Sequence, residues 1–253
     1  MNFSNIKSIL SGIGFFIYFT LILNGRCHGY VMPAEQLLDF MADNFSNYNT
    51  VIIVQSTLLT DQYNEKVFKE QIQLKSPNLF NLKVLDNIAD RTELPNMAYR
   101  QLLIANSRPR LEQLLSMMGI DLKSVSFTRI EGIIAYRIGE KEDDSPKLLI
   151  EKERFLPILL TYRPNVDMPE DLVTVRFQDY RKEDKGWFPF EIIYSVGNEV
   201  REEYTIQTLQ TNMPVSSSLL QTFRISSLPE RAPEEWPSNI EEERLQENIE
   251  TFE

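Results

Sequence analysis

The sequence predicts one α+β domain built on a large, curved antiparallel β-sheet with two or three α-helices. In the second half of the chain, apolar and polar side chains alternate along successive segments, as expected for a sheet with one buried and one wet face. Short polar turns separate these segments, which favours antiparallel neighbours. Nearer the start, apolar residues recur at helical spacing. Together these patterns predict helices packed on a sheet.

The first predicted element is a helix over Pro33–Ser46, in which Leu37, Leu38, Met41 and Phe45 share one face. Proline suits the first turn of such a helix. Three strands are predicted to follow. They are Thr50–Leu59, Lys66–Leu74 and Leu79–Leu85, and Ser76-Pro77-Asn78 divides the last two.

Two further helices are predicted over Met97–Ala105 and Pro109–Met118. Ser107 is placed to cap the second helix and Gly119 to end it. Neither helix carries a polar cluster beyond Arg100, Gln101, Arg108 and Arg110.

From Ser124 onward the pattern predicts mainly strands. These are Ile133–Gly139, Lys147–Glu151, Phe155–Tyr162, Leu172–Tyr180, Trp187–Ser195 and Glu199–Gln210. The apolar members of the alternation in the last three are Val173, Val175, Phe177, Phe188, Phe190, Ile192, Tyr194, Val200, Tyr204 and Ile206. We therefore expect about nine or ten strands in one sheet.

The N-terminal residues 1–29 are expected to be a cleavable export signal. A short basic start precedes the uncharged apolar run Gly12–Leu23, and Cys27-His28-Gly29 offers small residues for a cut before Tyr30. Two alternatives stay open. The run is shorter than the about 20 residues of a membrane span, which disfavours a retained anchor. Arg26 disfavours a lipoprotein signal, in which Cys27 would be lipidated.

Cys27 and His28 are the only cysteine and histidine of the chain, so the expected cut leaves neither. A Ser–His–Asp or Cys–His nucleophile and a His-ligated zinc ion are thereby excluded. Glu142, Asp143 and Asp144 lie in a predicted polar turn, where solvation explains them, and the glycines form no phosphate-binding loop. We expect no enzyme, no catalytic residue, no metal and no cofactor. A glycosidase-like carboxylate pair is the one catalytic arrangement left open.

The chain carries 26 basic and 37 acidic side chains, a net charge of −11. Removal of residues 1–29 takes Lys7 and Arg26 with it and leaves 24 basic side chains, a net charge of −13. Such a surface repels nucleic acid, which we do not expect as a partner. Nine acidic residues and three prolines fall within residues 228–253, which predicts a mobile tail. One domain is expected between signal and tail, over residues 30–227.

Several motifs resemble the LolA-like family, the periplasmic lipoprotein carriers and outer-membrane lipoprotein-sorting proteins. The matching motifs are Asp179-Tyr180-Arg181, Phe188-Pro189, Asn212, Phe223 and the hairpin-like segment Leu148–Arg163. In that family a similar triplet ends a strand before a charged turn, and an Asn ends the last long strand. The resemblance covers Pro33–Phe223 and concerns architecture, because none of these motifs is catalytic.

The resemblance implies an open, incomplete barrel whose concave side is lidded by helices around an apolar cavity for acyl chains. The candidate cavity residues are Phe177, Phe190, Ile192, Tyr204, Ile206, Met41 and Met118. The resemblance also implies a monomeric, non-catalytic periplasmic carrier of lipoprotein acyl chains or other lipid. Its partners would be an inner-membrane transporter that delivers the cargo and an outer-membrane acceptor.

Two features depart from that family. Its lid-closing arginine on an early strand has no counterpart on Thr50–Leu59, so Lys66 and Lys69 are positional candidates only. The stretch Asp86–Pro95 also resembles an insertion. Another cargo, such as a glycerolipid, therefore stays open. So does a sensor or adaptor of the same fold that regulates or assists an inner-membrane partner.

Overall fold

The structure is a computed structural model that describes residues 31–45, 47–61, 64–86, 95–164, 172–184 and 186–222. The chain divides into two units at Val31 and Met32, and the description concerns the second unit. The expected signal, the acidic tail, Phe223 and most of Asp86–Pro95 lie outside the described residues, so the domain boundaries stay predictions. Within the described ranges, no helix combines the length and apolarity that a membrane crossing requires.

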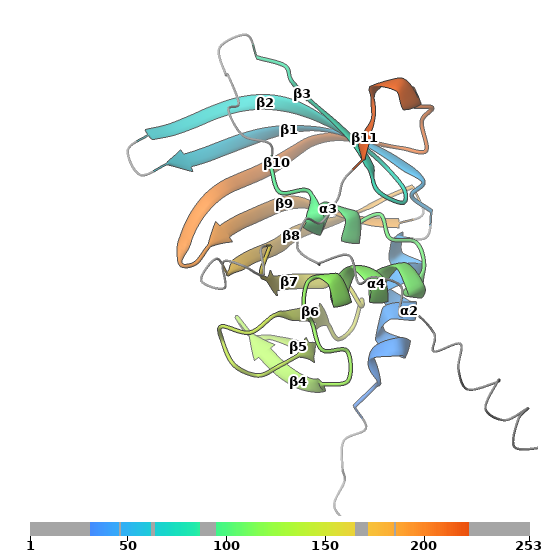
Figure 1. The fold of residues 1–253 in the computed structure, drawn as a ribbon, viewed down its shortest axis with the longest axis vertical. Helices are drawn as coiled ribbons and strands as arrows, with labels where there is room; N and C mark the ends of the chain where they lie inside the picture. Colours follow the sequence, from blue (N-terminus) through green and yellow to red (C-terminus); the bar gives the residue numbers. More distant parts are fainter. Residues whose placement is uncertain are drawn as a thin grey trace, which may run out of the picture. The chain divides into compact units, whose positions relative to one another are not determined.

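Eleven strands form one antiparallel sheet, shown in Figure 1, in the order β11-β3-β2-β1-β10-β9-β8-β7-β6-β5-β4. Their bounds are β1 Thr50–Asp61, β2 Asn64–Lys75, β3 Leu79–Val84, β4 Val125–Ile130, β5 Ile133–Gly139, β6 Lys147–Glu151, β7 Pro157–Tyr162, β8 Val173–Glu183, β9 Gly186–Val196, β10 Glu199–Thr211 and β11 Gln221–Thr222. Among the described strands, β11 and β4 are the two edges and do not pair with each other. The predicted α+β class and the open sheet are confirmed.

The first strand lies inside the sheet, between β2 and the last long strand, β10. Its register places Gln55 opposite Glu70 of β2 and opposite Ile206 of β10. Because side chains of paired residues lie on the same face of a sheet, these three strands contribute neighbouring side chains to one surface. Strands β1 and β10, which are far apart in the sequence, thus contribute to the same part of the interior.

Three helices, α2 (Ala34–Phe45), α3 (Ala98–Leu102) and α4 (Arg108–Met117), lie against one face of the sheet (Figure 1). The predicted first helix is confirmed, and its predicted apolar face is buried. The second helix is shorter than the predicted Met97–Ala105. Ser107 precedes α4 as expected, although its side chain makes no capping bond to a described residue. Gly119, with a φ of +79°, follows the helix in the left-handed conformation that glycine tolerates best.

The alternation predicted for β8 and β9 is confirmed, since Val175 and Phe177 of β8 and Ile192 of β9 are buried. One member of the β10 alternation is wrong. Val200 is 38% exposed, because the register shifts between Val200 and Glu202 and takes Val200 out of the inward alternation that Glu202, Tyr204 and Ile206 share. The sequence patterns also predict neither β4 nor β11.

Candidate ligand-binding site

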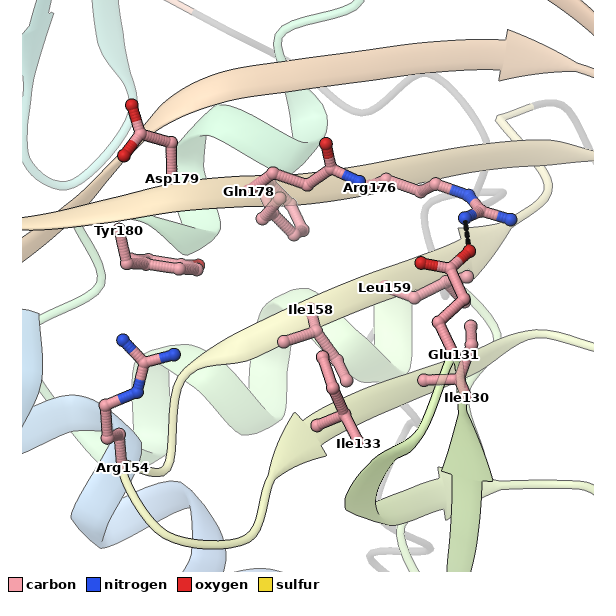
Figure 2. A pocket seen from close by; sticks show the side chains of 11 residues that line it. Ile130, Glu131, Ile133, Arg154, Ile158, Leu159, Arg176, Gln178, Asp179 and Tyr180 are labelled. Atoms are coloured by element: carbon pink, nitrogen blue, oxygen red, sulfur yellow. Dashed lines mark hydrogen bonds and ion pairs between the residues drawn. The ribbon is translucent and has the colours of Figure 1, made fainter.

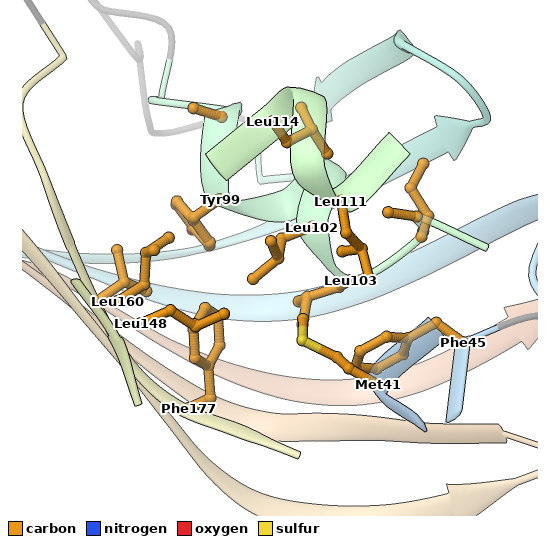
Figure 3. Packing of buried hydrophobic residues seen from close by; sticks show 14 of the residues in the cluster. Met41, Phe45, Tyr99, Leu102, Leu103, Leu111, Leu114, Leu148, Leu160 and Phe177 are labelled. Carbon is orange, nitrogen blue, oxygen red and sulfur yellow. The ribbon is translucent and has the colours of Figure 1, made fainter. Parts of the chain in front are cut away.

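All the predicted cavity residues lie in one hydrophobic cluster between the helices and the sheet. They are Phe177, Phe190, Ile192, Tyr204 and Ile206 on strands, and Met41 and Met118 at α2 and α4, each at most 5% exposed. Figure 3 shows Met41 and Phe177 in this cluster, together with Leu102 of α3 and Leu103, which follows that helix. The structure therefore brings the predicted residues together. Their contact with a ligand stays a prediction.

The same interior contains a buried polar network that joins α3 to the sheet. Arg100 of α3 donates through Nη1 to Oε1 of Gln55 on β1, over 3.2 Å. Gln55 in turn donates through Nε2 to Oε1 of Glu70 on β2, over 2.8 Å, and the Thr57 hydroxyl donates to the same oxygen over 2.7 Å. All four side chains are completely buried. A glutamine thus links a buried guanidinium to a buried carboxylate.

Two aromatic rings enclose the guanidinium. Its central carbon lies 4.4 Å from the centre of the Tyr204 ring and 5.1 Å from that of Tyr99, distances typical of cation–π contact. The Tyr204 hydroxyl donates to Oε2 of Glu202, which lies on the same inward face of β10. We call these seven residues the Arg100 cluster: Gln55, Thr57, Glu70, Tyr99, Arg100, Glu202 and Tyr204.

Burial affects the titration of this cluster. Burial raises the pKa of Tyr99 to about 12, because a phenolate would be poorly solvated there, although nearby Arg100 opposes the shift. Burial alone lowers the pKa of Arg100, but the facing hydroxyls and Glu70 raise it, and the net shift is upward. The guanidinium is therefore charged at any pH at which the protein folds.

Arg100 is a buried cation that the sequence patterns do not predict. The positional candidates Lys66 and Lys69 are both exposed on β2. The buried cation comes instead from the helix side, and the strands supply its polar partners. A signal was present, because Gln55 and Thr57 share strand parity with the buried Val51 and Ile53. Polar residues at apolar positions of a strand predict a polar partner in the interior.

A hollow of about 220 Å³ lies around β8, and Figure 2 shows it from close by. Its apolar residues include Ile130, Ile133 and Ile158. Arg176 of β8 and Glu131 of the β4–β5 turn form an ion pair at its rim. Arg176 alternates with the core residues of β8 and therefore lies on the sheet face away from the helices. The hollow thus combines a small apolar floor with paired charges.

The carboxylates considered as candidates for catalysis lie in a turn between β5 and β6. Its backbone carbonyls accept hydrogen bonds, that of Glu142 from Lys147 and that of Asp144 from Arg163. In the part of the chain that the structure describes, no three His, Cys, Asp or Glu side chains gather in a way that would hold a metal ion.

Three solved structures illustrate the similarity of this fold to known proteins. A DUF1329 family protein from Desulfovibrio piger matches with a TM-score of 0.48 at 10% identity, over 74% of this chain and 96% of its own. A LolA superfamily protein from Nitrosomonas europaea matches at 0.45 and 12% identity, over 72% of this chain and 96% of its own. An outer-membrane lipoprotein-sorting protein domain from Vibrio parahaemolyticus matches at 0.45 and 10% identity, over 73% and 96%.

No protein-family model matches the sequence, and no curated protein matches it either. LolA superfamily and lipoprotein-sorting proteins, whose family the sequence motifs resemble, are among the solved structures that the chain is similar to. At 10% and 12% identity, this likeness is one of fold.

Proposed function

We propose that the protein is a non-catalytic carrier that shelters acyl chains between its helices and its sheet. The observation that carries this proposal is the interior itself. One face of an open sheet presents large apolar side chains, and the cover on it consists of short helices. Helix α3 has five residues and is tied to the sheet by the buried polar network of Arg100. A cover made of small separate pieces can move away from the sheet without unfolding it.

The proposed interior suits hydrocarbon chains. Each methylene removed from water contributes about 0.8 kcal/mol, so a long acyl chain binds tightly without polar contacts along its length. Met41 and Met118 have flexible, polarisable side chains that can adapt to chains of different shape. Shielding of this kind is what a protein needs to move lipid through water.

The proposal includes the compartment and the partners. The protein would be exported by cleavage before Tyr30 and would act as a monomer in the periplasm. It would receive lipoprotein acyl chains or another long-chain lipid from an inner-membrane transporter and pass them to an outer-membrane acceptor. The expected signal sequence and the apolar interior support this route.

The test is native mass spectrometry of protein purified from a periplasmic fraction, with lipid extraction and titration of the delipidated protein with a fluorescent acyl probe. A bound phospholipid or acylated peptide, and saturable uptake of the probe, are expected. Ile206→Thr in the interior should weaken probe binding several-fold. Val67→Thr, at a position 70% exposed on β2, is the matched control and should leave binding unchanged.

A ligand-free mass together with no uptake of the probe would contradict the carrier function. It would favour the alternative, a sensor or adaptor that acts on an inner-membrane partner. The hollow around β8 supports that second function, since an apolar floor with charges at its rim is a typical protein-contact surface. Arg176→Ala would then weaken the complex with the membrane partner, whereas it should not affect acyl binding.

A further inference from the structure

Three successive residues of α3 carry buried polar atoms that make no hydrogen bond of good geometry to a described residue, although the Tyr99 and Tyr204 hydroxyls lie close enough to Arg100 to affect its pKa. These atoms are the hydroxyl of Tyr99, Nε and Nη2 of Arg100, and both amide atoms of Gln101. The buried hydroxyl of Tyr162 on β7 likewise makes no hydrogen bond of good geometry to a described residue. Each of the four side chains is at most 1% exposed. Buried polar groups in folded proteins nearly always have partners, so a concentration of such atoms requires an explanation.

These atoms lie beside the predicted acyl-binding residues. The Tyr99 ring centre is 6.2 Å from that of Phe177 and 6.0 Å from that of Tyr194. Figure 3 shows Tyr99 on the helix side of the interior, with Phe177 and Leu160 on the sheet side. Strand β7 presents Tyr162 to the same hydrophobic cluster. The unbonded polar atoms therefore belong to the proposed ligand site.

The geometry of the unbonded atoms favours a hydrogen-bond acceptor. Nε and Nη2 of a guanidinium place two N–H groups on one edge, where they can grip an oxygen atom with two lone pairs. Nη1 of Arg100 is already directed to Gln55. The hydroxyls of Tyr99 and Tyr162 are additional donors. A bare hydrocarbon in this place would leave all these donors unbonded.

The charges of the cluster select between acceptors. Arg100 is accompanied by two carboxylates, those of Glu70 and Glu202, both at most 9% exposed. A free fatty acid or a phosphate would add a further negative charge to a buried site that already has more acidic than basic groups, which is costly. A neutral carbonyl oxygen can use the same donors without that cost. The site therefore fits an uncharged carbonyl better than an anion.

We propose that the interior recognises the neutral carbonyl linkage of an esterified or amide-linked acyl chain. Arg100, Tyr99 and Tyr162 donate to the carbonyl oxygens, and the hydrocarbon lies among the apolar residues around Phe177. This inference rests on the proposed carrier function and names the chemical class of its cargo.

The test is competition for the bound fluorescent acyl probe by four ligands with the same twelve-carbon chain. They are methyl laurate, N-methyl lauramide, the laurate anion and dodecyl methyl ether, which has no carbonyl. In the unaltered protein, the ester and the amide are expected to displace the probe at concentrations about tenfold or more below those of the ether and of laurate.

Variants assign the preference to particular residues. Arg100→Met should bring the ester and the ether to nearly equal affinity while the ether still binds. Tyr162→Phe keeps the ring and the packing, and should reduce the preference about threefold even if Arg100→Met fails to fold. Arg108→Met is the matched control, because Arg108 is a half-exposed arginine paired with Asp39 on the surface, and it should leave the ratio unchanged.

The outcomes separate this inference from the proposed function. Equal displacement by ester and ether in the unaltered protein, or stronger displacement by laurate, overturns the inference and leaves the carrier function intact. No uptake of the probe at all overturns the carrier function, and the inference with it. If the preference for the ester persists in both Arg100→Met and Tyr162→Phe, other residues bind the carbonyl group, and the inference is overturned.

Discussion

Arg100 on helix α3 and Gln55 on strand β1 are joined by a hydrogen bond of 3.2 Å in the interior of the protein, where neither side chain is exposed. Gln55 is at the same time bonded to Glu70, so the short helix is connected through one glutamine to two central strands. A buried guanidinium is costly to desolvate, and its bonds must compensate. The position of α3 on the sheet therefore depends on this contact.

The first prediction concerns stability. Arg100→Met should lower the free energy of unfolding by about 3–5 kcal/mol, because it removes the buried cation that Gln55 connects to the Glu70 carboxylate. Urea unfolding followed by circular dichroism measures this change. Arg108→Met, the surface control, should change stability by about 0.5 kcal/mol or less. Combining Arg100→Met with Glu70→Gln should recover part of the loss. No recovery would mean that the two charges are not coupled.

A second prediction compares two buried tyrosines. The Tyr204 hydroxyl donates to Glu202, whereas the Tyr162 hydroxyl bonds no described residue. Tyr204→Phe should destabilise the protein by about 1–3 kcal/mol, because the buried Glu202 carboxylate loses a hydrogen bond. Tyr162→Phe should leave the ligand-free protein equally or more stable. Thermal unfolding of both variants measures the two losses of stability. Equal losses would contradict the difference in hydrogen bonding between the two hydroxyls.

The strand pattern could be predicted because its cause is local. Val175, Phe177 and Ile192 face the core simply because side chains alternate along a strand. Where the strand pairing is irregular, the alternation along the sequence no longer predicts which side chains are buried. The shift after Val200 exposes that residue, and no residue type in the segment indicates that the register changes there. Strand β4 was missed because its side chains are only half-buried, which gives a weak alternation.

The burial of the seven candidate residues could be predicted from the same parity and from helical spacing, but the burial of Arg100 and its polar partners could not. A charged residue in a predicted helix is expected on the surface. Its burial results from contacts between segments far apart in the chain, since Arg100 and Gln55 are separated by 45 positions. Only the polar pair Gln55 and Thr57, at inward positions of an apolar strand, pointed to this region.

A third prediction follows from the Tyr99 pKa, which burial raises from an ordinary value of 10.0 to about 12. The folded state then holds this proton more tightly than the unfolded state. Its contribution to stability is complete below pH 10, and it is lost as the pH rises from about 10 to about 12, a loss of about 3 kcal/mol. The free energy of unfolding measured in urea at pH 8, 10 and 11 should fall above pH 10.

Tyr99→Phe tests the assignment of that pH dependence. The variant should lose less stability between pH 10 and 11 than the unaltered protein, although burial also raises the pKa of Tyr162 and leaves part of the fall in place. Tyr136→Phe is a control, since that ring lies in the same hydrophobic cluster. An identical fall in the unaltered protein and in Tyr99→Phe would assign the alkaline sensitivity to other groups.

The last prediction concerns the length of the bound chain. If hydrocarbon is sheltered by apolar side chains, each pair of added methylenes should raise affinity about tenfold, since each methylene contributes about 0.8 kcal/mol. Beyond the chain length that the interior can enclose, affinity should stop rising.

Competition of methyl esters of eight to sixteen carbons against the acyl probe measures both the slope of affinity with chain length and the length at which the affinity reaches its plateau. Phe177→Ala removes a large side chain from the interior and should move the plateau to longer chains, whereas Val67→Ala on the surface should not. A slope near zero in the unaltered protein would mean that the chains remain in contact with water, and would exclude the interior as their site.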